Sequence, residues 1–155
     1  MQPRVTSHPL NSDNSLYVPA DPTVVSWASN DAAPGSDHGT TILTSHVNYV
    51  INGKLVIGAL ADLAQYAQSA IGKIITLHTR EGITLRYRII AGREYSKDQL
   101  AASPQLRATL FDQTSAFGPA SNPTGRLVLV SCGGAFDPAT GEYEDNVFLY
   151  ALPVS

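Results

Sequence analysis

Apolar and polar residues alternate in several short segments of the chain, which is typical of β-strands that bury one face and expose the other. The clearest pair covers residues 73–79 and 83–90, joined by a turn around Gly82. From Ile83 to Ile89 every second position is apolar, and the positions between are polar. The pattern therefore predicts a β-hairpin in this part of the chain.

Segments rich in β-branched and aromatic residues predict further strands. Residues 40–47 and 126–132 are the most convincing, and the second of them ends at a cysteine that two glycines follow. A last strand is expected at 146–154, after a turn-rich loop at 133–145. Asn52, with the glycine that follows it, is a strong signal for a tight hairpin turn. Two shorter extended pieces, interrupted by prolines, are expected at 16–19 and 23–29.

Two segments show helical features. Residues 59–70 place leucine and alanine on one face at helical spacing, which predicts an amphipathic helix that Gly72 ends. Residues 103–111 predict a short helix, with Ser103 as its N-cap and Pro104 at its first position.

Because predicted strands outnumber helices and run to both ends of the chain, we expect a mainly β fold. The sheet should be mostly antiparallel and curved or closed, with one or two helices at its margins. Residues 1–15 are polar and are expected to form a loose leader, and residues 16–155 are expected to form one domain.

Composition narrows the class of protein. Of the 155 residues, 43% are hydrophobic and 15% are charged, which is enough to fill a core and excludes wholesale disorder. A formal net charge of −3 argues against nucleic-acid binding, which needs clustered lysine and arginine. The single cysteine excludes an internal disulfide framework and a zinc site with several cysteines. No apolar stretch approaches the roughly 20 residues of a membrane span, and no signal peptide is found.

Cys132 and His46 are the candidates for chemistry. Cys132 stands where a buried strand is expected to end, and the two glycines after it leave backbone N–H groups open to a substrate. An adjacent imidazolium favours the thiolate that a cysteine nucleophile needs. His46 ends another predicted strand, whereas the other histidines fall in the leader, a loop and a hairpin. The alternatives are an inert buried thiol and a strand histidine bonded to a backbone carbonyl.

Metal and cofactor sites are not predicted. The acidic cluster of Glu142, Glu144 and Asp145 lacks the spacing of a calcium-binding loop. No glycine-rich run lies between a predicted strand and a predicted helix, so phosphate-binding and dinucleotide-binding patterns are absent.

Several motifs together resemble the sortases, and among them the actinobacterial class F. They are TTILTSHV, KIITLHTREGITLRYRI and RLVLVSCGGAFDPATGEYEDNVFLYA, and the resemblance extends over about residues 16–152. It implies a closed or nearly closed β-barrel of about eight strands and a cysteine transpeptidase without cofactor. By resemblance, Cys132 is the nucleophile and His46 is the histidine of the site.

The resemblance also implies a substrate and a location. The enzyme would cleave an LPXTG-like sorting signal after its threonine and pass the acyl group, through a thioacyl-enzyme, to an amine of a cell-wall peptide or a pilin lysine. It would act at the extracellular face of the bacterial membrane, held there only by an anchor that is absent from this chain.

Three departures from the family are visible. Ser131 replaces a threonine before the cysteine, and Ser45 replaces a glycine before the histidine. The family carries an arginine near the start of its last strand, and this place falls on Asn146 here. Arg126, the last basic residue of the chain, is the second candidate for substrate or oxyanion support, although six residues of strand set it about 20 Å from Cys132.

Other arginines and other functions stay open. Arg86 and Arg88, on a neighbouring predicted strand, are further candidates to reach the groove. The missing arginine leaves open a weakened sortase fold that only binds peptides. A cysteine peptidase with water as the acceptor is the third hypothesis.

Overall fold

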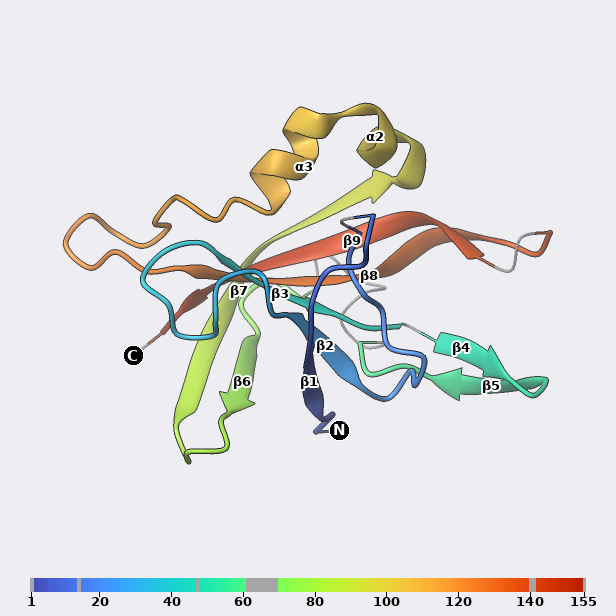
Figure 1. The fold of residues 1–155 in the computed structure, drawn as a ribbon, viewed down its shortest axis with the longest axis horizontal. Helices are drawn as coiled ribbons and strands as arrows, with labels where there is room; N and C mark the ends of the chain where they lie inside the picture. The colour runs from blue at the N-terminus through green and yellow to red at the C-terminus, as the bar shows by residue number, and fades with distance from the viewer. Residues whose placement is uncertain (1, 14, 47, 61–69, 140–141, 155) are drawn as a thin grey trace.

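Figure 1 shows the computed structural model, a twisted β-sheet with two short helices along one side. The structure describes residues 2–13, 15–46, 48–60, 70–139 and 142–154. Among these, the side chains of residues 48–51, 55, 56, 132–137 and 142 are not described.

Seven strands form one sheet in the order β1-β2-β3-β8-β9-β7-β6, and β4 and β5 form a separate hairpin. Neighbouring strands are antiparallel except for the parallel pairs β1–β2 and β3–β8. The expected mainly β, mostly antiparallel fold is confirmed, with β1 and β6 at the two ends of the strand order. The strands are β1 (Val5–His8), β2 (Val25–Ala28), β3 (Thr40–Thr44), β4 (Asn48–Ile51), β5 (Lys54–Ile57), β6 (Ile74–His78), β7 (Thr84–Ser96), β8 (Arg126–Asp137) and β9 (Glu142–Pro153). The described helices are α2 (Lys97–Ala102) and α3 (Pro104–Leu110).

The central strands β3 and β8 are covered on both faces of the sheet. Along β8, Leu127 and Leu129 pack into one hydrophobic cluster, and Val128 and Val130 pack into a second. Helix α3 covers the second cluster through Leu110, which is buried there. Burial on both faces explains why these two strands have nearly continuous runs of small and apolar residues instead of an alternating pattern.

The predicted hairpins and the helix at 103–111 are confirmed. Strand β6 pairs with β7, and β4 pairs with β5 around Asn52 and Gly53. These two residues have φ angles of 51° and 77°, the left-handed conformation that a two-residue hairpin turn of this kind requires. In α3, the Ser103 side chain accepts a hydrogen bond from the Leu106 N–H at 3.1 Å, and Pro104 begins the helix.

The region after Cys132 differs from the prediction. We expected a loop at 133–145, but β8 continues to Asp137 and pairs with β9, which begins at Glu142. A shift in register between Gly133 and Phe136 interrupts the ladder. A bulge accommodates glycine within a paired strand, so the glycine pair that we interpreted as a turn is part of a long hairpin.

The N-terminal segment also differs from the prediction. Strand β1 lies within residues 1–15, for which the sequence indicates no regular structure. Residues 16–19 form no strand, because Pro19 and Pro22 interrupt pairing. A contact with the end of β3 holds residues 16–19 instead. Thr44 Oγ1 donates a hydrogen bond to the Tyr17 carbonyl at 2.7 Å.

One helix was missed and another lies outside the structure. Helix α2 begins with a capping box, in which Ser96 accepts from the Gln99 N–H and the Gln99 side chain accepts from the Ser96 N–H. The predicted helix at 59–70 falls mostly on residues 61–69, which are outside the described residues.

Candidate active site

A cavity of about 660 Å³ opens between the N-terminal segment, the end of β3, the helices α2 and α3, and strands β8 and β9. Figure 1 shows these helices lying beside β9 and β8, on the same side of the sheet. Most of the lining is apolar, and the side chains that contribute include Leu16, Ile42, Leu100, Phe111, Val130 and Phe148. Asp31, His46 and Arg107 are the ionisable residues among the described lining.

His46 lines this cavity and is half-buried. Its Nε2 atom lies 2.8 Å from the carbonyl oxygen of Pro19. A carbonyl oxygen only accepts, so we infer that Nε2 carries a proton. The contact fixes the orientation of the ring against the N-terminal segment. It is also the contact expected of the alternative, in which a strand histidine bonds to a backbone carbonyl.

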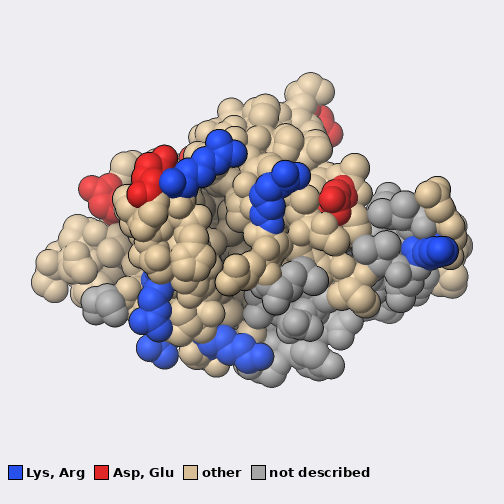
Figure 2. Space-filling model, turned by 90° about the horizontal axis from the view of Figure 1, so that it is seen from below, with Lys and Arg blue, Asp and Glu red and all other residues tan. Residues whose placement is uncertain are grey.

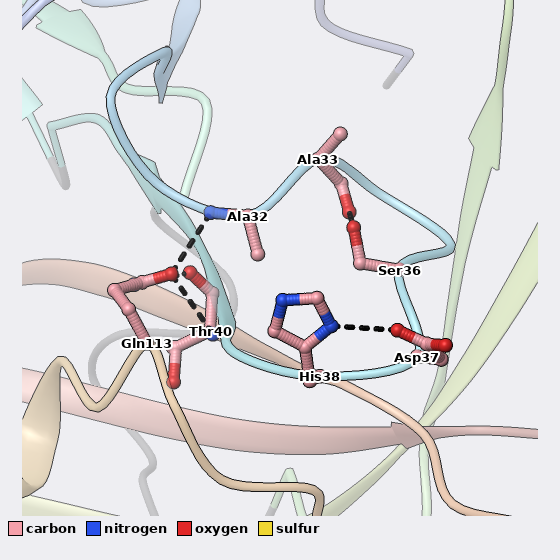
Figure 3. A network of polar contacts seen from close by, with 7 residues as sticks. All are labelled: Ala32, Ala33, Ser36, Asp37, His38, Thr40 and Gln113. Atoms are coloured by element: carbon pink, nitrogen blue, oxygen red, sulfur yellow. Dashed lines mark hydrogen bonds and ion pairs between the residues drawn. The ribbon is translucent and has the colours of Figure 1, made fainter.

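The other histidines lie elsewhere. His8 stacks on Tyr17 with 4.1 Å between ring centroids, and His78 contacts Thr84 within the β6–β7 hairpin. His38 bonds to Asp37 at 2.6 Å on an exposed loop, and this bond lowers the pKa of Asp37. Figure 3 shows that pair beside the contacts of Gln113, which hold the same loop to the start of β3. His46 is therefore the one histidine among the described residues that line the cavity.

Cys132 is placed by its backbone, since its side chain is outside the described part of the structure. Its residue partner across the β8–β9 ladder is Asn146. On the other side of β8, the parallel register with β3 runs to Thr44 opposite Val130, and the Ser45 N–H then donates to the Val130 carbonyl at 3.3 Å. The chain therefore stays beside β8 up to the residue before His46.

Asn146 and Ser131 are polar residues of the cavity wall that have no hydrogen-bond partner among the described residues. The half-buried side chain of Asn146 forms no hydrogen bond with another described residue. Ser131 is 6% exposed, and its hydroxyl is buried with no partner in the described structure. Both groups are free to meet a ligand's polar atoms, and Asn146 offers two N–H donors and an acceptor without charge.

Arg126 does not line the cavity. Its Nε donates to Thr40 Oγ1 at 3.0 Å, and its Nη2 donates to the carbonyls of Thr109 at 2.7 Å and Leu110 at 3.1 Å. The guanidinium also lies 4.1 Å from the ring centre of Phe117. Burial lowers its pKa. These contacts fasten the start of β8 to β3 and to the end of α3, and this role does not involve the cavity.

Two charged cavity residues were missed by sequence reasoning. Arg107 projects from α3, and Asp31 follows β2; burial raises the pKa of Asp31. No sequence signal marks which face of a seven-residue helix meets a cavity, so Arg107 was not identifiable. Arg86 and Arg88, which the sequence left open, are exposed on β7 and are not among the lining residues.

Charged side chains are dispersed on the face of the molecule that Figure 2 shows. On the face shown in Figure 2, Lys and Arg side chains lie in separate groups, and Asp and Glu occur between some of them. Over the described residues there is no group of three or more His, Cys, Asp or Glu side chains arranged to hold a metal ion. In the same part of the chain, no helix is both long enough and apolar enough to cross a membrane.

Comparison with solved structures shows that the fold is that of the sortases. Sortase C1 from Streptococcus agalactiae is 17% identical, with a TM-score of 0.54 over 90% of this chain. Sortase C from Clostridium perfringens is 10% identical, with a TM-score of 0.55 over 97%. The sortase D5 transpeptidase of Clostridium perfringens is 16% identical, with a TM-score of 0.51 over 97%.

The matches do not extend over the whole of these sortases. The chain spans 60%, 62% and 70% of the three, in the same order. No protein-family model matches the sequence. No curated protein matches it either.

Proposed function

We propose that this protein is a sortase-type cysteine transpeptidase, most like the class F sortases, in which Cys132 is the nucleophile and His46 transfers protons. Asn146 takes the place of the arginine that the family carries on its last strand. The proposal combines the sortase fold with the motifs around residues 46 and 132 and with a cavity next to both segments.

The observation that carries the proposal is the register of β3 and β8. Thr44 is paired with Val130, and His46 and Cys132 each follow two residues later. Strand β3 ends at Thr44, and we propose that the chain keeps this register for the next two residues, which would set His46 and Cys132 level with each other. Because positions two apart on a strand share a face, we expect position 132 to belong to the face of Val130, which lines the cavity.

The chemistry follows from these residue types. The Cys132 thiolate attacks the carbonyl carbon of the threonine in an LPXTG-like signal, and a tetrahedral oxyanion forms. As the bond to the next residue breaks, His46 donates a proton to the departing amine, and a thioester remains. An incoming amine then attacks the thioester, His46 accepts its proton, and the thiolate leaves as the new amide bond forms.

The neutral Asn146 should make this a slow sortase. Its amide can donate to the carbonyl oxygen of the peptide or to the oxyanion, but such a bond is weaker than one from a guanidinium. The same observation favours a second candidate, a sortase fold that binds sorting-signal peptides with little turnover.

The proposed partners follow from the proposed reaction. The acyl donor is the sorting signal of a surface protein, and the acceptor is an amine of a cell-wall peptide or of a pilin lysine. The proposed transpeptidation would take place at the outer face of the bacterial membrane.

The deciding experiment combines product analysis with thiol trapping. The wild-type chain, Cys132→Ala and His46→Ala are incubated with an LPXTG peptide, with and without triglycine, and the products are identified by mass spectrometry. We expect a triglycine adduct only with the wild type. Equal product from Cys132→Ala would refute the proposal, and cleavage without any adduct would identify a peptidase that uses water.

Trapping separates the enzyme from the binding module. A vinyl sulfone or methanethiosulfonate probe should label an activated Cys132 near neutral pH much faster than it labels a free thiol such as N-acetylcysteine. Labelling at the rate of the free thiol, together with peptide binding, would favour the binding module.

A further inference from the structure

We propose that Arg107 makes the cavity selective for peptides with a carboxylate side chain within about three residues of the cleaved bond. This inference rests on the proposed function, because it concerns the peptide bound in the same cavity. It assigns a specificity-determining role to a residue of α3 and leaves the reacting groups unchanged.

One nitrogen of Arg107 holds the guanidinium in place. Its Nη1 donates hydrogen bonds to the carbonyl oxygens of Leu100 and Ala101, the second at 3.0 Å. Both carbonyls belong to the last turn of α2, where helix carbonyls have no partner within the helix. The two helices thus fix the charged group at the cavity wall before any peptide binds, which reduces the entropy lost on binding.

The remaining donors form a fork. The Nε–H and Nη2–H groups of Arg107 have no hydrogen-bond partner among the described residues. This edge of a guanidinium matches the two oxygens of a carboxylate and binds them with two parallel hydrogen bonds. A neutral amide or an ammonium group on the peptide offers no equivalent pair of acceptors.

The surroundings of Arg107 strengthen this preference. Leu100, Ala108 and Phe111 line the cavity near it in sequence, and apolar walls exclude water and so strengthen a charge interaction. None of the described Asp or Glu residues forms an ion pair with Arg107. Asp31, the acidic residue of the described lining, forms no ion pair with Arg107.

The size of the cavity sets the position of the carboxylate. A compact space of 660 Å³ is about 11 Å across, and an extended peptide covers about 3.3 Å per residue. A carboxylate at Arg107 is therefore at most about three residues from a bond cleaved near His46 and Asn146. We assign it to the acyl side of the peptide, which remains bound through both half-reactions.

The test compares peptides that differ in one side chain. Fluorogenic LPXTG-like peptides carry Glu, Gln or Lys at X or in place of the proline, which are the second and third residues before the cleaved bond, and kcat/KM is measured for each. We expect the wild type to prefer Glu over Gln about tenfold at one of these positions, since a charge-assisted bond replaces a neutral one. Arg107→Gln should bring the ratio close to one, and Arg107→Lys should leave an intermediate ratio.

Controls exclude a general effect of charge or folding. Arg88→Gln removes an exposed arginine of β7 that does not line the cavity, and the ratio should stay at the wild-type value. Loss of the contacts to α2 can lower the amount of folded Arg107→Gln, but a ratio of two peptides on one sample is independent of that amount. An equal rate for Glu and Gln in the wild type, or a ratio that Arg107→Gln leaves unchanged, overturns the inference.

Binding separates this inference from the proposed reaction. If no peptide is cleaved, the transpeptidase proposal fails, and fluorescence anisotropy with labelled peptides decides the inference alone. Tighter binding of the Glu peptide that Arg107→Gln abolishes would support it. Equal binding of Glu and Gln peptides, or no binding of either, would overturn it.

Discussion

Asn146 is a neutral donor that, in the proposed function, takes the place of a charged donor of the sortases. It lines the cavity, and its backbone is paired with that of Cys132. We predict that Asn146→Arg raises kcat/KM for an LPXTG peptide roughly fivefold, because a hydrogen bond from a charged donor is about twice as strong as a neutral one. Asn146→Gln, which lengthens the side chain without charge, is the control. A rate for the arginine variant no higher than that of the glutamine variant would contradict the prediction.

Two buried serines flank the proposed pair and differ in their hydrogen bonds. Ser45 Oγ donates to the Val24 carbonyl at 2.6 Å, whereas the Ser131 hydroxyl has no partner in the described structure. A buried hydroxyl without a partner costs free energy, and a bonded one contributes about 1 kcal/mol. We predict that Ser45→Ala lowers the free energy of unfolding by about 1 kcal/mol, while Ser131→Ala leaves it unchanged or raises it.

Urea unfolding of both variants beside the wild type measures this difference. If Ser131→Ala costs as much as Ser45→Ala, the Ser131 hydroxyl is bonded in solution. The KM for the peptide is a second measurement. If the Ser131 hydroxyl bonds to the bound peptide, Ser131→Ala should raise KM without destabilising the free protein.

At the residue scale, the sequence identified the candidates but not their surroundings. The motif around Cys132 and the strand that leads to His46 suffice to name both residues. The carbonyl of Pro19 that holds the His46 ring comes from a segment 27 residues earlier in the chain. Side-chain contacts of this kind depend on how loops cross the sheet, and no local pattern encodes that.

Strands β7 and β9 bring two carboxyl groups together at their ends. Hydrogen bonding with the Asp145 carboxyl, followed by burial and the negative charge of Asp145, raises the pKa of the exposed Glu94. The folded state therefore binds the Glu94 proton more tightly than the unfolded state. This contribution to stability is complete below the unfolded pKa of about 4.5 and is lost as the pH rises through the folded pKa.

We predict that Glu94→Gln changes the pH dependence of thermal unfolding. The melting temperature of the variant relative to the wild type should rise between pH 4 and pH 7, because the repulsion between two carboxylates is removed only where both are ionised. Glu81→Gln, in the turn between β6 and β7, is the matched control, and its difference from wild type should stay constant. A flat difference for Glu94→Gln would show that the two groups do not interact in solution.

At the element scale, local signals predicted hairpins and a capped helix better than strand ends. The Asn52 turn and the Ser103 cap act within a few residues, and both are confirmed. The ends of β8 and β9 depend on pairing between distant segments. Because of this pairing, β8 continues beyond Gly133, although glycine disfavours a strand interior. The capping box of α2 was visible in the sequence as Ser96 and Gln99, but the helix is too short to show a periodic apolar pattern.

The N-terminal segment connects the edge of the sheet with the wall of the cavity. Strand β1 pairs with β2 from Val5 to His8, and the chain then contributes Leu10 and Leu16 to the lining. The Leu10 N–H is held by the Asn30 side chain at 2.8 Å. The same pairing that ends the sheet on this side thus also positions one wall of the proposed peptide site.

This connection predicts a joint loss of stability and affinity when β1 is removed. Deletion of residues 1–9 takes away several backbone hydrogen bonds worth about 2 kcal/mol in total, which corresponds to about 5 °C in melting temperature for a chain of this size. It also removes the support that β1 gives to Leu10 and Leu16 at the cavity wall. We therefore expect KM for an LPXTG peptide to rise severalfold, with a smaller change in kcat because His46 and Cys132 are unaltered.

A single substitution is the control for the deletion. His8→Ala removes the stack on Tyr17 but keeps the backbone pairing of β1, so it should change the melting temperature and KM much less than the deletion does. If the shortened chain melts at the wild-type temperature and binds peptide equally well, β1 does not support the cavity. If only stability falls, the wall is held by contacts such as that between Leu10 and Asn30, and Asn30→Ala should then raise KM by itself.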